Sequence, residues 1–106
     1  QLGRPQITAR ALYELGNLRL HEQKLEEADV ALREMQEIIP SGDQELHALF
    51  LYGQARLAAS RGQIQQAQHL GEASATAFEE MGHHEAQRVK KWLASIIAPH
   101  SPLADS

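Results

Sequence analysis

Apolar side chains recur at intervals of three and four residues along most of the chain, which places them on one face of an α-helix. The first such stripe, between residues 8 and 21, consists of Ala11, Leu12, Leu15, Leu18 and Leu20. Pro5 suits the first turn of this helix, because the first-turn N–H groups have no partner within a helix. We therefore expect a helix here with one coherent buried stripe.

The same periodicity returns four more times, and turn-forming residues separate the segments. The five predicted helices are residues 8–21, 25 to 38 or 39, the segment between 43 and 61, 64–81 and about 84–97. Pro40 blocks the second helix, and Ser41 or Asp43 can cap the third. Gly82 is expected to adopt the left-handed backbone conformation that commonly follows the end of a helix. No segment shows the pattern of a β-strand, and the connections are short, so the chain is predicted to be all-α with antiparallel neighbours.

The chain nearly repeats itself after 39 residues. Four positions of the first half, Gly16, Leu25, Ala28 and Leu32, fall on Ala55, Ile64, Ala67 and Gly71. A repeat of this length that contains only helical pattern indicates stacked helical hairpins. Such arrays bind other molecules over a continuous surface, so the repeat predicts a binding function more than a catalytic one.

The first repeat resembles the tetratricopeptide repeat (TPR) family. The residues that carry the resemblance are Leu12, Leu15, Gly16, Ala28, Leu32 and Pro40. Gly16 and Ala28 lack bulk where two helices would cross, so the leucines can interdigitate around them. The resemblance implies a short right-handed solenoid with two repeats and a C-terminal helix, in residues 1–98. Residues 99–106 contain Pro99 and Pro102 and are expected to form a disordered tail.

The second repeat departs from the family pattern. Ala55 replaces the glycine and Glu79 replaces the closing proline, which lengthens the repeat, while Gly62 takes the turn position that Gln23 has in the first repeat. Such elongated repeats resemble those of bacterial multidomain regulators. An alternative function is therefore that of a sensor segment within a larger signal-transduction ATPase or transcription regulator. The chain begins at Gln1 and enters a helical pattern almost at once, so we expect it to be a piece of a longer polypeptide.

The resemblance also implies a concave groove lined by the first helix of each hairpin. The partner-binding residues expected there are Tyr13, Asn17, Tyr52, Arg56, Arg88, Lys91 and Trp92. The aromatic side chains would offer a surface for a peptide, and the cations would attract an acidic segment. Packing between helices is the alternative role of the aromatic residues, and a solvated basic face is the alternative role of the cations. Tyr13 stands where carboxylate-binding family members have lysine, so their clamp is not expected here.

Composition narrows the remaining function classes. Ten basic and 14 acidic residues give a formal charge of −4, which disfavours nucleic acid as a partner. Cysteine is absent, which agrees with a reducing compartment, and we expect a cytoplasmic location. No apolar run is long enough to cross a bilayer, so no membrane contact is expected.

Catalytic and metal-binding motifs are also missing from the sequence. No phosphate loop, nucleophile elbow or HExxH spacing occurs, so we expect a non-enzymatic protein without cofactor or metal. The function predicted first is a protein–protein interaction module that binds a peptide or a partner domain, which includes another domain of the same parent chain. A third possibility is self-association as a homodimer through an open end near Ile7, Leu18 and Leu25.

Overall fold

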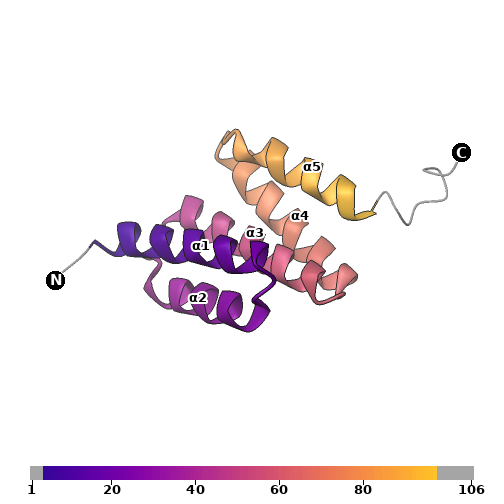
Figure 1. The fold of residues 1–106 in the computed structure, drawn as a ribbon. Helices are drawn as coiled ribbons and strands as arrows, with labels where there is room; N and C mark the ends of the chain where they lie inside the picture. The colour runs from indigo at the N-terminus through magenta and orange to yellow at the C-terminus, as the bar shows by residue number, and fades with distance from the viewer. Residues whose placement is uncertain (1–3, 98–106) are drawn as a thin grey trace, which may run out of the picture.

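A computed structural model describes residues 4–97, and within this range the chain is entirely helical, with five helices and no strand. The helices are α1 (Pro5–His21), α2 (Leu25–Ile38), α3 (Gln44–Ser60), α4 (Ile64–Glu80) and α5 (Glu85–Ile97) (Figure 1). These bounds confirm the five predicted helices, with differences of a few residues at their ends. The predicted tail, residues 99–106, lies outside the described residues.

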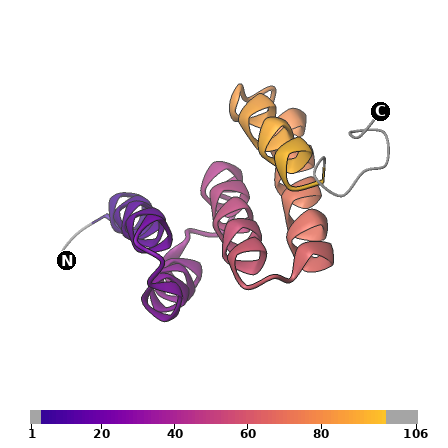
Figure 2. The ribbon, with the colours of Figure 1, turned by 45° about the vertical axis from the view of Figure 1, so that its right-hand side comes forward.

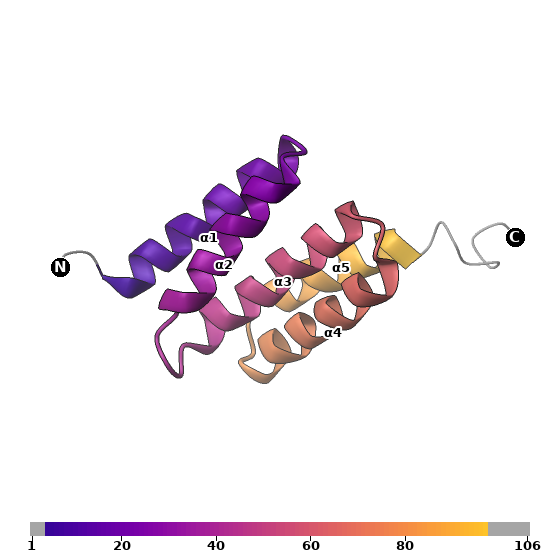
Figure 3. The same cartoon turned by 90° about the horizontal axis from the view of Figure 1, so that it is seen from below.

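The helices pack mainly as sequence neighbours. α1 packs against α2 and α3 against α4, and the first hairpin contacts the second through α3. α5 packs chiefly against α4 (Figures 2 and 3). α3 therefore stands between the first hairpin and α4 (Figure 2).

The turns follow the residues that favour them. The Asp43 carboxylate accepts a hydrogen bond from the backbone N–H of Leu46 at 3.1 Å and caps α3. Gly62 and Gly82 follow the ends of α3 and α4 with φ of 79° and 66°. The predicted cap and both predicted turn glycines are thus confirmed.

The junction of the two hairpins forms around one leucine. Leu32 of α2 is fully buried. A Cβ atom added to Gly16 of α1 would lie 3.1 Å from Cδ2 of Leu32. A Cβ atom added to Gly53 of α3 would lie 2.8 Å from the same Leu32 atom. The Leu32 side chain therefore occupies the space that the two glycines leave open, as expected for Gly16 from the sequence.

The predicted buried stripe of α1 is wrong for three of its five residues. The residues that α1 buries are Ala9, Tyr13, Gly16 and Leu20. Of the predicted stripe, Leu20 is buried and Leu12 packs partly against the core, but Ala11, Leu15 and Leu18 are exposed. The physical reason is that α2 and α3 cover only one side of this terminal helix, whereas its apolar residues extend around a wider arc.

Gln23 is the residue that departs from ordinary backbone geometry in the described chain. Its φ is 64°, in the left-handed region, and it occupies the turn position that Gly62 has in the second repeat. A side chain in this conformation costs about 1 kcal/mol. We expect Gln23→Gly to raise the free energy of unfolding by about 0.5–1 kcal/mol and Gly62→Gln to lower it by about 1 kcal/mol. Urea denaturation measures both, and a stabilising effect of Gly62→Gln would contradict the explanation.

Candidate functional site

The predicted binding residues come from three helices. Tyr13 and Asn17 lie one turn apart on α1, and Tyr52 and Arg56 lie one turn apart on α3, so each pair shares a helix face. Trp92 of α5 joins them. We call Tyr13, Asn17, Tyr52, Arg56 and Trp92 the aromatic–arginine cluster.

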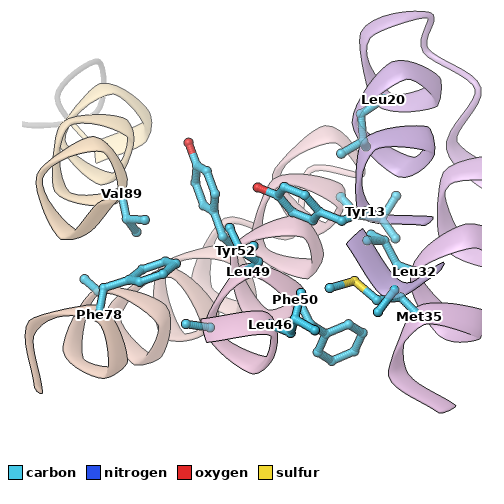
Figure 4. Close-up of a cluster of buried hydrophobic side chains, with 14 of the residues drawn as sticks. Tyr13, Leu20, Leu32, Met35, Leu46, Leu49, Phe50, Tyr52, Phe78 and Val89 are labelled. Carbon is cyan, nitrogen blue, oxygen red and sulfur yellow. The ribbon is translucent and has the colours of Figure 1, made fainter. Parts of the chain in front are cut away.

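The two tyrosine rings belong to the core. Tyr13 is 6% and Tyr52 7% exposed, and the Tyr13 ring packs beside Gly53. Their hydroxyl oxygens lie on the same side of α3, between α1 and α5 (Figure 4). Burial raises the pKa of Tyr52, and the nearby Arg56 guanidinium partly opposes this shift. The rings therefore serve packing, while the hydroxyl ends point toward the space between the first and last helices.

Arg56 connects the other members of the aromatic–arginine cluster. Its Nη2 donates a hydrogen bond to Oδ1 of Asn17, across one full repeat of 39 residues. Its Cζ lies 4.6 Å from the centroid of the Tyr52 ring, in cation–π geometry. Its Nε is buried and has no hydrogen-bond partner among residues 4–97. An unpaired buried donor destabilises the fold.

Trp92 closes the cluster from α5. Its ring meets the Tyr52 ring edge to face, with centroids 5.6 Å apart and planes at 83°. A surface depression of about 540 Å³ lies beside these residues. It is lined by Asn17, Leu20, His21, Gln23, Arg56, Ala59, Ser60 and Trp92.

The two predicted cations of α5 lie outside this cluster. Arg88 is exposed and its Nε lies 3.4 Å from Oε1 of Glu85 on the same helix. Lys91 is also exposed and makes no salt bridge within the described range. Both stand on the helix that carries Trp92, so they add positive charge at its flank.

Sequence reasoning missed an ionic link between α1, α3 and the segment before α5. Arg10 Nη2 lies 3.3 Å from Oε1 of Glu45, and His83 Nε2 lies 3.0 Å from Oε2 of the same carboxylate. His83 Nδ1 accepts a hydrogen bond from the backbone N–H of Glu85, so Nε2 is the donor toward Glu45. The three residues are far apart in the sequence, and no motif marks them.

This link makes stability depend on pH. The hydrogen bond from His83, together with the Arg10 guanidinium, lowers the pKa of Glu45 below its ordinary value of 4.5, although burial partly opposes them. A lowered carboxyl pKa stabilises the fold above the unfolded-state pKa, and this contribution is lost as the pH falls through the folded-state pKa. As the pH falls through the folded-state pKa of Glu45, we expect the free energy of unfolding of Glu45→Gln to decrease less than that of the original chain. Urea denaturation at several pH values measures this difference. Glu34→Gln, at an exposed position on α2, is the control, and an equally small decrease in both variants would contradict the assignment.

A second depression, of about 500 Å³, lies at the turn between α2 and α3. Its apolar lining comes from Ile39, Pro40 and Ala77, with His47 and Glu80 at its edge. None of the predicted binding residues lines it. It is therefore separate from the aromatic–arginine cluster.

Two further observations concern residues 4–97. No group of three or more histidine, aspartate and glutamate side chains in this range lies close enough together to hold a metal ion. None of the helices described there has the length and apolar character needed to cross a membrane.

Comparisons of this chain with protein-family profiles, curated proteins and solved structures give no match.

Proposed function

We propose that the chain is a non-enzymatic protein-interaction module, built as a short TPR-like solenoid, that binds an acidic peptide segment along α1, α3 and α5. The observation that carries this proposal is the aromatic–arginine cluster beside the 540 Å³ depression, with Arg56 at its centre. The segment belongs either to a separate protein or to another domain of the same parent chain.

The chemistry of the surface favours an acidic, extended ligand. The Arg56 side chain lines the depression, and a carboxylate or a backbone carbonyl of a peptide there would accept hydrogen bonds from its guanidinium group. Lys91 adds a positive charge on α5, and Arg88 lies on the same helix paired with Glu85, whereas the formal charge of the whole chain is −4. A local basic surface on an acidic protein steers acidic segments toward that surface.

Peptides selected by phage display on the immobilised chain test the proposal. We expect the selected peptides to be acidic and to shift the emission of Trp92, the only tryptophan. Arg56→Gln is expected to weaken their binding about tenfold or more, because a hydrogen bond to a charged group contributes about 1.5–3 kcal/mol. Lys91→Gln, at an exposed position, is expected to weaken binding less and without effect on folding.

Arg33→Gln on α2 is the matched control, because Arg33 is an exposed arginine outside the cluster. Circular dichroism verifies that each variant keeps its helical content. Peptides that bind Arg56→Gln and Lys91→Gln as tightly as the original chain, or that leave Trp92 emission unchanged, would place the binding surface elsewhere. A selection that yields no peptide at all would count against a peptide-binding function.

A further inference from the structure

Three of the five large hydrophobic residues that the described chain exposes lie on α1. Ile7 is 61%, Leu18 49% and Leu15 38% exposed. Together with exposed Ala11 they follow spacings of four, four and three residues, so they form one stripe along the helix. At 1.5 Å per residue this stripe is roughly 16 Å long. We call these four residues the α1 stripe.

The internal repeat shows what happens to the same face elsewhere in the chain. The residues 39 positions after the stripe are Leu46, Phe50, Gln54 and Leu57 of α3. Leu46, Phe50 and Leu57 are buried in the core that α3 forms with the helices packed on it. This face of a repeat helix thus accepts a neighbouring helix, whereas on α1 it has none among residues 4–97.

The exposed surface of α5, the last helix of the described range, is mostly polar. Its exposed positions include Gln87, Arg88, Lys90 and Lys91, and its apolar members Ala94 and Ile97, the latter 37% exposed, do not continue into a stripe like that of α1. Stacking the α5 end of one copy on the α1 stripe of another would bury these charges against leucine and isoleucine. A closed dimer through the same face on both copies avoids this cost.

When two copies of α1 run antiparallel, the charged residues beside the α1 stripe of one copy face residues of opposite charge in the other copy. In the register that places Ile7 of one copy against Leu18 of the other, the small Ala11 faces Leu15. The same register brings Arg10 of each copy opposite Glu14 of the other, on the same rim of the interface. Opposite charges in these places favour this register and orientation over the parallel one.

The surface of the α1 stripe also has room for a side chain of the second copy. A shallow, mostly apolar depression of about 280 Å³ lies on α1, lined by Gln6, Ile7, Arg10, Ala11 and Glu14. Ala11 contributes little bulk there, so a leucine side chain from the facing helix can occupy it.

We propose that two copies of this chain associate through the α1 stripe, as an antiparallel pair of α1 helices related by a two-fold axis. The contact consists of a single pair of short helices, so we expect a weak dimer. This inference concerns a different face from the aromatic–arginine cluster, and it does not depend on peptide binding.

Sedimentation equilibrium of the purified chain, from low to high micromolar concentration, tests the proposal. We expect the mass to rise from that of one chain to that of two. The variant Ile7→Gln/Leu18→Gln is expected to stay monomeric throughout. Val30→Gln is the matched control, because Val30 is 55% exposed but lies on α2, and it is expected to dimerise like the original chain.

A charge exchange tests the register itself. Glu14→Arg alone places two arginines opposite each other, and Arg10→Glu alone places two glutamates opposite each other, so each homodimer is expected to weaken about tenfold. A mixture of the two variants restores both opposite-charge pairs and is expected to recover the heterodimer. Circular dichroism confirms that both are folded, since Arg10 also pairs with Glu45 of its own chain.

Three outcomes would overturn the proposal. The first is that the chain stays monomeric at the highest concentration. The second is that the dimer persists in Ile7→Gln/Leu18→Gln, and the third is that the mixed charge variants associate no better than either variant alone. The first outcome would leave the α1 stripe to a helix of a different protein or domain.

Discussion

Replacement of Leu32 by alanine is expected to lower the free energy of unfolding by about 3–5 kcal/mol, which is a large part of the stability of a domain of this size. Leu32 is fully buried between the backbones of Gly16 and Gly53. Helix backbones do not move easily into the space left by a deleted side chain, so the cavity persists. Urea denaturation measured by circular dichroism gives the change.

Two further variants make this prediction specific. Val30→Ala on the same helix removes an exposed side chain and is expected to change stability by less than about 0.5 kcal/mol. Gly53→Ala alone places a Cβ atom 2.8 Å from Leu32 Cδ2, whereas in the Leu32→Ala background the same Cβ enters the vacated space. The double variant should therefore be more stable than Leu32→Ala, and simple additivity would contradict the described junction.

Replacement of Phe78 by alanine is expected to cost a similar amount, about 3–5 kcal/mol, and to act on the other end of the molecule. Phe78 of α4 is fully buried, and its ring centroid lies 5.0 Å from that of His83, in the segment that leads into α5. Val89 of α5 belongs to the same cluster (Figure 4). Loss of the ring therefore loosens the attachment of α5 to α4.

Hydrogen exchange distinguishes this effect from a uniform loss of stability. We expect amide protons of α5 to exchange faster in Phe78→Ala than those of α1 and α2, and the emission of Trp92 to shift toward that of an exposed indole. Thr76→Ala, at an exposed position of α4, serves as the control and should leave both measurements unchanged. Equal acceleration in all five helices would show that Phe78 does not act locally on α5.

The helices were predictable because their periodicity and end signals are local properties. Asp43, Gly62 and Gly82 each determine a turn through their own side chain or backbone. Which face of α1 is buried was not predictable in the same way. Apolar residues occupy more than one side of that helix, and the position of its neighbours decides among them.

Some features of the candidate site were also predictable from the sequence, and others depend on how the helices pack. Asn17 and Arg56, which are 39 residues apart, were both predicted to line the groove, and the structure brings their side chains into contact. The depth of Tyr13 and Tyr52 in the core, and the link from Arg10 through Glu45 to His83, depend on how hairpins and α5 pack together. Interactions of that kind leave no spacing rule in the sequence.

The hydrogen bond from Arg56 to Asn17 ties the first hairpin to the second with the same side chain that we assign to ligand binding. If a ligand binds Arg56 and leaves Nη2 on Asn17, we expect it to reinforce the angle between the hairpins. A ligand that draws the guanidinium away from Asn17 weakens this angle and carries that cost in its own affinity. If Arg56 binds the ligand as we propose, the affinity for the ligand and the equilibrium between the two arrangements of the junction are thermodynamically linked.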